Sequence, residues 1–129
     1  MEDKKTVLVL EDEKPLLEAI KCKLENSGFE VVTCRSVEQA ESYLEDLKDV
    51  AVIWLDHYLL GKKNGLDFVA QVKNDERFKT IPIFVVSNTA SQEKVTSYIS
   101  LGITKYFTKS DYRLDQIIDD IKDVLAHDQ

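Results

Sequence analysis

Six consecutive apolar residues, Val50 to Leu55, run directly into the carboxylate of Asp56. A run this short and this apolar is typical of a strand that is buried on both faces at the centre of a parallel sheet. Ligands of open α/β sheets bind beyond the carboxyl ends of the strands, so Asp56 is expected where chemistry would take place. Taken alone, an aspartate in this position is as readily explained by the start of a turn, and the rest of the chain has to decide.

Four further apolar runs also predict strands, and five segments with helical spacing of apolar residues alternate with them. The predicted strands cover residues 6–10, 29–33, 50–55, 81–86 and 103–108. This alternation predicts a doubly wound, five-stranded parallel sheet with a flavodoxin-like (βα)5 arrangement. The length of 129 residues fits one domain, residues 1–129. In the expected strand order 2-1-3-4-5, strands 1 and 3 flank the ligand crevice.

Capping signals set the limits of several predicted helices. Residues 36–39 have the form of a capping box that opens the second helix, and residues 89–92 give a similar signal for the fourth. The fourth helix is expected to bury Val95, Tyr98, Ile99 and Leu101. The last helix is expected to begin near residue 110 or 111. The segment 56–65 contains two glycines and an Asn-Gly pair, which predict turns.

The net charge of −7 argues against direct binding to nucleic acid or to an anionic membrane, because both attract basic surfaces. No apolar run approaches the roughly 18–20 residues of a membrane span, and the first residues lack the apolar segment of a secretory signal. A cytoplasmic protein is therefore expected. Cys22 and Cys34 have neither CxxC spacing nor histidine partners, so they are expected to be reduced packing residues. His57 and His127 are too far apart in sequence to suggest a metal motif.

Reactive side chains end four of the five predicted strands, and the strand without one is the outermost in the expected order. They are Glu11 with Asp12, then Asp56, Ser87 and Lys109. Parallel strands share one carboxyl edge, so these groups are expected to gather there. Each has an ordinary interpretation as a surface or helix-entry residue, but their joint placement indicates a site.

Three carboxylates within about 4–6 Å repel one another by roughly 3–4 kcal/mol per pair at an effective dielectric constant near 20. A cation is needed to offset this repulsion, and oxygen-only ligands with open positions favour Mg²⁺. The ion would keep Asp56 ionised and able to attack a phosphoryl group. Lys109 and the Ser87 hydroxyl would then stabilise the phosphoryl oxygens.

Four motifs carry a resemblance to a known family: residues 7–13, residues 54–56 with Gly65, residues 81–87 and residues 102–109. Through them the sequence resembles, over essentially its whole length, the receiver domain of response regulators in two-component (His-Asp phosphorelay) systems. The resemblance implies a signalling domain that catalyses only its own phosphorylation and slow dephosphorylation. It also implies a histidine kinase or a histidine phosphotransfer protein as the phosphodonor.

The resemblance also assigns roles to residues. It implies that Asp56 is the phosphoacceptor and that Mg²⁺ is bound by Asp12, Asp56 and the backbone carbonyl of Tyr58, with Glu11 acting through water. It implies that Ser87 and Tyr106 form the switch, that Lys109 binds the phosphoryl group, and that Tyr58 and Thr89 tune hydrolysis. An effector protein or a second copy would dock on the surface of the fourth helix, fifth strand and fifth helix.

The sequence departs from the family pattern in three places. Leu60 stands where proline is usual and Lys62-Lys63 lengthen the turn, so the conformation of residues 57–65 stays open. Asn88 replaces a small residue, and Ser110 replaces a proline that usually follows the lysine through a cis bond. The geometry of the Lys109–Ser110 bond therefore also stays open.

Three other functions fit parts of the sequence. A flavin-binding protein shares the expected fold, but residues 11–13 would repel the flavin phosphate. An aspartyl-nucleophile phosphatase needs a second acid two residues after the nucleophile, where this chain has Tyr58. A pseudo-receiver that acts only as an interaction module would not need the complete set of acids, Ser87 and Lys109. The sequence names neither the kinase nor the output, and it leaves open whether the chain is a stand-alone regulator or part of a larger one.

Overall fold

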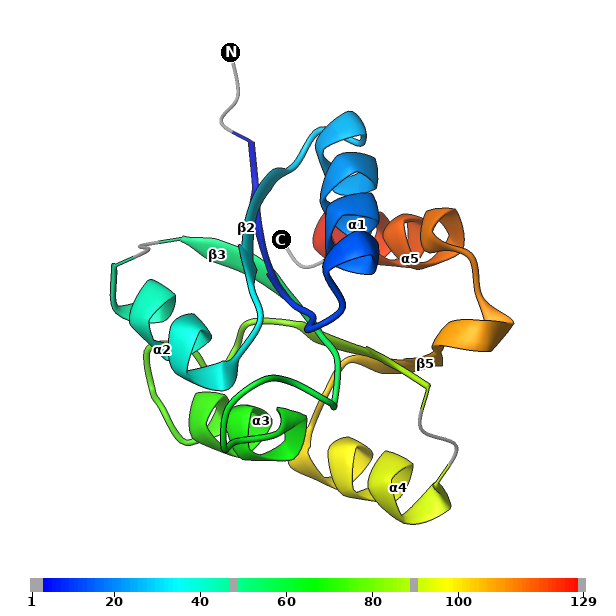
Figure 1. Cartoon of the computed structure of the whole chain (residues 1–129). Helices are drawn as coiled ribbons and strands as arrows, with labels where there is room; N and C mark the ends of the chain where they lie inside the picture. Colours follow the sequence, from blue (N-terminus) through cyan, green and yellow to red (C-terminus); the bar gives the residue numbers. More distant parts are fainter. Residues whose placement is uncertain (1–3, 47–48, 89–90, 128–129) are drawn as a thin grey trace.

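The computed structural model describes residues 4–46, 49–88 and 91–127, in which five strands alternate with five α-helices (Figure 1). The strands are β1 (Thr6–Leu10), β2 (Glu30–Cys34), β3 (Val50–Leu55), β4 (Ile83–Ser87) and β5 (Lys105–Thr108). The helices are α1 (Lys14–Asn26), α2 (Val37–Asp46), α3 (Gly65–Lys73), α4 (Gln92–Leu101) and α5 (Leu114–His127), with a short 3-10 helix, η1 (Lys109–Asp111), before α5.

The strands form one parallel sheet in the order β2-β1-β3-β4-β5, as the sequence predicts. β3 is central, pairing with β1 on one side and β4 on the other. In the register, Leu10 lies beside Leu55, so the residues that follow β1 and β3 leave the sheet side by side. The carboxyl edge therefore brings Glu11 and Asp56 together.

Alternation along the strands divides the interior into two cores, one on each face of the sheet. Val52 and Trp54 of β3 pack with α1 and α5, and Ile53 and Leu55 pack with α2, α3 and α4. Figure 1 shows this division, with α1 and α5 on one side of the sheet and the other three helices on the opposite side. Both cysteines are free as predicted, but only Cys34 is buried, while Cys22 is exposed.

Three strands begin later than the sequence predicts. β2 is Glu30–Cys34 where 29–33 is predicted, β4 is Ile83–Ser87 where 81–86 is predicted, and β5 is Lys105–Thr108 where 103–108 is predicted. The preceding residues bond elsewhere: the N–H of Phe29 donates to Leu24 O at the end of α1, and that of Ile81 donates to Phe78 O. Pro82 has no N–H to donate to the sheet.

The start of α3 differs from the turns predicted through residue 65. Oδ1 of Asn64 accepts from the Asp67 N–H at 3.0 Å, and Oδ2 of Asp67 accepts from the Asn64 N–H at 2.9 Å. This reciprocal capping box starts a helix at Gly65. The Asn-Gly pair is therefore a helix start rather than a turn.

Burial of Ile99 in α4 is also predicted wrongly, because its side chain is 61% exposed. Tyr98 is the fully buried residue of the described helix, with Val95 and Leu101 half-buried. One residue along a helix is a rotation of about 100°, which turns Ile99 away from the sheet. Within the predicted capping signal of residues 89–92, Ser91 is the residue that caps the helix, because its hydroxyl accepts from the Lys94 N–H.

The last helix begins later than residue 110 or 111. Residues Lys109–Asp111 form η1, Tyr112 is extended, and the side chain of Gln116 accepts from the Arg113 N–H at 2.8 Å, so α5 begins at Leu114. No cis peptide bond occurs among the described residues, so the Lys109–Ser110 bond is trans. In the part of the chain that the structure describes, the helices are all too short or too polar to cross a membrane.

Candidate functional site

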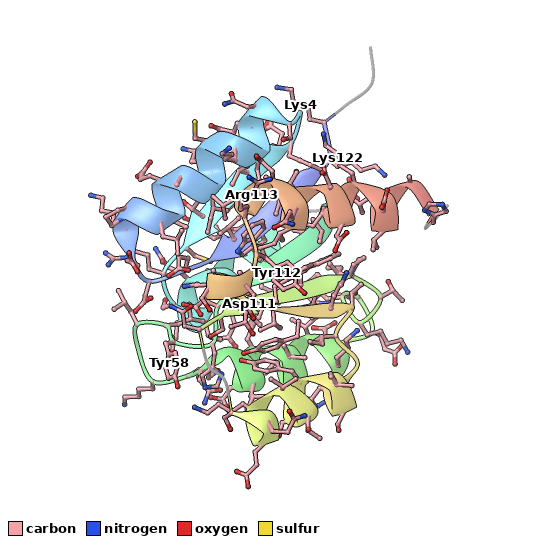
Figure 2. The ribbon with its side chains drawn as sticks, turned by 90° about the vertical axis from the view of Figure 1, so that its right-hand side faces the viewer. Lys4, Tyr58, Asp111, Tyr112, Arg113 and Lys122 are labelled. Atoms are coloured by element: carbon pink, nitrogen blue, oxygen red, sulfur yellow. The ribbon has the colours of Figure 1, made fainter. Side chains whose placement is uncertain are left out.

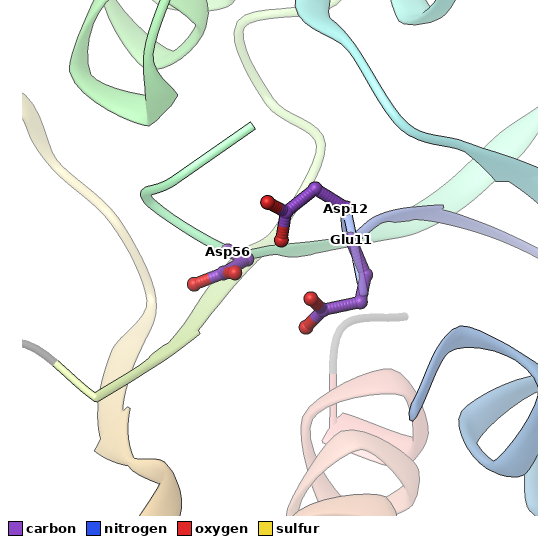
Figure 3. Close-up of side chains that lie close together, drawn as sticks. All are labelled: Glu11, Asp12 and Asp56. Carbon is purple, nitrogen blue, oxygen red and sulfur yellow. The ribbon is translucent and has the colours of Figure 1, made fainter. Parts of the chain in front are cut away.

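Three carboxylates meet where β1 and β3 end. Ligand oxygens of Glu11, Asp12 and Asp56 all lie within 4.8 Å of one another, and Figure 3 shows them gathered beyond the two strands. The sheet fixes this placement, because the Asp56 N–H donates to Leu10 O at 2.9 Å and the Glu11 N–H donates to Cys34 O at 3.0 Å. All three acids stand where the sequence predicts, and their geometry allows them to hold a metal ion.

Glu11 is completely buried, and this position is electrostatically costly. Burial, with the nearby charge of Asp56, raises the pKa of Glu11 to about 7 in spite of contacts that favour the charged form. Oε2 accepts from the Glu13 N–H at 3.1 Å, but Oε1 is buried without an aligned hydrogen bond from the described residues. A buried carboxyl group beside Asp12 and Asp56 is suited to a cation or to a cation-bound water.

Lys109 reaches this acid cluster from the end of β5. Its Nζ lies 2.8 Å from Oε1 of Glu11, an ion pair by distance, and donates to Oδ2 of Asp56 at 3.3 Å. Burial acts to lower the pKa of Lys109, but the pairing with Glu11 and Asp56 outweighs burial and raises it. The lysine is therefore a charged group held against the predicted acceptor.

The loop after β1 is fixed by Arg35, which the sequence analysis does not single out. Nε and Nη2 of Arg35 donate to the backbone oxygen of Asp12 at 3.0 and 2.7 Å. Arg35 also accepts, through its backbone oxygen, the N–H of Leu60 at 2.9 Å. One arginine at the end of β2 thus ties the loop that carries Asp12 to the loop that follows Asp56.

Ser87 and Tyr106 are brought together at the carboxyl edge beside Asp56. Ser87 is fully buried at the end of β4, and the half-buried phenol of Tyr106 on β5 is hydrogen-bonded to its side chain. Burial raises the pKa of Tyr106 more than this bond lowers it, so the phenol is neutral. The structure thus joins the two residues that the sequence predicts as a switch.

His57, which the sequence excludes only as part of a metal motif, is buried next to Asp56. Its N–H donates to Oδ1 of Asp56 at 2.8 Å, and its Nδ1 lies 2.6 Å from the hydroxyl of Tyr98 on α4. Burial and Lys94 lower the pKa of His57, so the ring is neutral at pH 7. A signal exists in the sequence: a tyrosine on a buried helix face needs a partner for its hydroxyl, and His57 is one of few candidates.

The loop from His57 to Asn64 is more ordered than its turn residues suggest. A parallel bridge joins Ser36 to Leu60, and Lys63 pairs with Glu41 of α2 at 3.1 Å. Gly61 adopts a positive φ of 86°, which glycine accommodates at no steric cost. These contacts give the conformation that the sequence leaves open.

Tyr58 points outward from this loop and is 52% exposed (Figure 2). Its hydroxyl accepts from Nζ of Lys94 at 2.8 Å, and that nitrogen also lies 4.9 Å from the ring centroid. The ring packs edge-on against His57. Thr89, the other predicted hydrolysis-tuning residue, lies outside the described residues.

Comparison with known proteins gives a consistent assignment. The family model for the response regulator receiver domain matches residues 7–122. The phosphate regulon transcriptional regulatory protein PhoB of Pseudomonas aeruginosa is 30% identical over 105 residues, which are 81% of this chain but 45% of that protein. The chemotaxis protein CheY1 of Helicobacter pylori is 30% identical over 104 residues, 80% of this chain and 83% of that protein. The chain therefore spans less than half of PhoB and most of CheY1.

A solved structure agrees in both fold and sequence. The phosphorylated cyanobacterial phytochrome response regulator RcpA has a TM-score of 0.81 and 30% sequence identity, covering 95% of this chain and 91% of that one.

Proposed function

Because this chain belongs to the response regulator receiver domain family, we propose that it accepts a phosphoryl group on Asp56 and transmits that event through a change of surface. The phosphodonor is a histidine kinase or a histidine phosphotransfer protein. The chain acts as a signalling receiver in the cytoplasm, where such donors present their phosphohistidine, and it catalyses only its own phosphorylation and slow dephosphorylation.

One observation carries this proposal: an ionisable acceptor, two further acids and a lysine converge from three strand ends. Oδ2 of Asp56 faces Nζ of Lys109 at 3.3 Å, and the ligand oxygens of Glu11 and Asp12 lie within 4.8 Å of an Asp56 oxygen. A nucleophilic carboxylate with a cation beside it is suited to phosphoryl transfer, which depends mainly on positioning and electrostatics.

In the proposed step, an oxygen of Asp56 attacks the phosphorus of the donor. A new O–P bond forms, the P–N bond to the donor histidine breaks, and the electron pair of that bond stays on the imidazole nitrogen. Lys109 holds charge against the phosphoryl oxygens, and the Ser87 hydroxyl supplies a hydrogen bond to one of them.

The donor set fits Mg²⁺. All the side-chain donors are oxygens, which hard divalent cations prefer, and the ligand oxygens of Glu11, Asp12 and Asp56 all lie within 4.8 Å of one another. Asp12, Asp56 and the backbone carbonyl of Tyr58 would hold the ion directly, with Glu11 acting through water. Bound Mg²⁺ would supply positive charge that keeps Asp56 ionised and neutralises the entering phosphoryl group.

We expect the output to use Ser87 and Tyr106. A phosphoryl oxygen competes for the Ser87 hydroxyl that is now hydrogen-bonded to Tyr106. The ring of Tyr106 packs 6.0 Å from that of Tyr98, so movement of one residue is felt on α4. The surface of α4, β5 and α5 then changes, and an effector protein or a second copy docks there.

The test is labelling by a small phosphodonor. We expect the wild-type chain to take up phosphoryl groups in Mg²⁺ buffer and to lose labelling in EDTA, while Asp56→Asn takes up none. Asp111→Asn, an exposed acid on η1, is the matched control and should label normally (Figure 2). Equal labelling of wild type and Asp56→Asn would exclude Asp56 as the acceptor, and absence of labelling in both would favour the interaction module.

A further inference from the structure

A cavity of about 380 Å³ lies between α1 and α5, on the opposite side of the sheet from α4. Leu16, Ile20, Leu114 and Ile117 line it, together with Trp54 of β3. Its volume falls in the range of about 300–1,000 Å³ that is usual for small-molecule sites. The apolar lining accommodates a hydrocarbon or aromatic body.

Trp54 forms the buried end of this apolar wall. Its side chain is fully buried, and its Nε1–H has no hydrogen-bond partner among residues 4–46, 49–88 and 91–127. This nitrogen has almost no accessible surface, so Trp54 serves the cavity as apolar lining rather than as a hydrogen-bond donor.

The charges around the cavity favour an anion. Lys23, Lys109 and Arg113 line it, against one acid, Asp115. Lys23 is paired with Asp115 at 3.0 Å, and Lys109 is paired with Glu11 and Asp56. The guanidinium of Arg113 has no ion pair within the described part of the chain, and Figure 2 places Arg113 in the connection between η1 and α5.

We propose that this cavity binds a small amphipathic carboxylate, such as a medium-chain fatty acid. Its apolar tail lies among Leu16, Ile20 and Ile117, and its carboxylate binds Arg113, which offers a planar pair of donors to such a group. None of the three acids of the cluster lines this cavity. Lys109 lines the cavity and also donates to Asp56, so it is the one residue that the two sites have in common.

The experiment uses the whole chain without Mg²⁺ or phosphodonor, so its result does not depend on phosphorylation. Trp54 is the one tryptophan of the chain, so its fluorescence and its indole N–H resonance both report from the cavity. Octanoate is titrated beside 1-octanol and octylamine, which have the same tail. We expect saturable binding of octanoate, a change in the tryptophan fluorescence or in the indole N–H resonance, and affinity roughly tenfold or more above that of either control.

Three variants locate the site. Arg113→Gln should weaken octanoate binding by roughly tenfold or more, while Lys122→Gln, which removes a charge from α5 away from the cavity, should leave it unchanged (Figure 2). Leu114→Phe fills the cavity and should abolish binding, with unfolding curves confirming that the variant folds. Equal binding of the three probes, unaltered binding by Arg113→Gln or Leu114→Phe, or the absence of any saturable change in wild type would overturn the proposal.

Discussion

Nζ of Lys109 lies 2.8 Å from Oε1 of Glu11, which pairs a lysine from the last strand with a fully buried acid from the first loop. The pairing does not restore an ordinary carboxyl, because the pKa of Glu11 remains raised to about 7, mainly by burial. The protonation of Glu11 therefore depends on whether a further cation binds at the acid cluster.

The first prediction concerns stability in the absence of metal. Between pH 4.5 and about 7, folded Glu11 holds its proton while the unfolded chain has released it, so this residue contributes stability at low pH that is lost as pH rises. The unfolding free energy of Glu11→Gln minus that of wild type should grow by on the order of 3 kcal/mol across this window. Urea unfolding in EDTA at several pH values measures it. Saturating Mg²⁺ should reduce the pH dependence of this stability difference. A difference that does not change with pH in EDTA would contradict the raised pKa of Glu11.

The second prediction concerns the metal site. Asp12→Ala and Asp56→Asn should abolish Mg²⁺ binding, because each removes a direct ligand and its charge, whereas Glu11→Gln should only weaken it. Trp54 lies two residues before Asp56 and serves as the fluorescence probe. Asp111→Asn provides a control outside the cluster. If Asp12→Ala and Asp56→Asn both titrate like wild type, the ion binds elsewhere.

The third prediction concerns the switch. A phosphoryl mimic should shift backbone resonances on α4, β5 and α5 in wild type, since the change is a shift between two populated states. In Ser87→Ala the shifts should stay near Asp56, because the hydroxyl that connects the phosphoryl group to Tyr106 is gone. NMR spectra with and without the mimic decide this. If the resonance shifts of wild type are confined to the loop after Asp56, transmission through Ser87 and Tyr106 is ruled out.

The fourth prediction concerns the lifetime of phospho-Asp56. Tyr58 carries no group that activates water, and Lys94 binds its hydroxyl at 2.8 Å, so the ring is held beside the acceptor loop. Tyr58→Asn or Tyr58→Glu should speed loss of the phosphoryl group by roughly tenfold, about 1.4 kcal/mol of barrier. Tyr58→Phe keeps the ring and should decay at nearly the wild-type rate. Loss of radiolabel in Mg²⁺ buffer is the measurement; equal or slower decay in both polar variants would assign the lifetime to Thr89 or to the loop.

The fifth prediction concerns the bond between His57 and Tyr98. Tyr98→Phe leaves a buried ring nitrogen without its partner and should destabilise the fold by about 1–3 kcal/mol. Tyr112→Phe, an exposed tyrosine whose ring contact with Phe107 is kept, should change stability by less than about 0.5 kcal/mol. Chemical denaturation compares the two. Equal stability of both variants would mean that the His57–Tyr98 bond contributes nothing.

The positions of the acids could be predicted because each follows an apolar run whose strand order is dictated by parallel crossovers. The environment of His57 could not, because it depends on the angle at which α4 packs, and a helical pattern does not specify that angle. The exposure of Ile99 has the same origin. The late start of α5 depends on one side-chain bond, from Arg113 N–H to Gln116, which competes with the capping residues upstream.

Gly65 illustrates a contact that sequence patterns do not reveal. A Cβ at this position would collide with the hydroxyl of Tyr98 and would lie 3.1 Å from the backbone oxygen of Asp56. Its φ is not positive, so the reason for glycine is the close approach of α3, α4 and the end of β3 rather than a turn.

The contact between Lys109 and Asp56 joins residues 53 positions apart, across β4. During synthesis the ribosome releases the acceptor long before it releases the lysine, and closing so long a loop is entropically costly until β4 and β5 have added to the sheet. A nascent chain therefore carries the acceptor aspartate without the charge that faces it. On the proposed function, phosphoryl transfer to Asp56 would therefore await completion of the sheet.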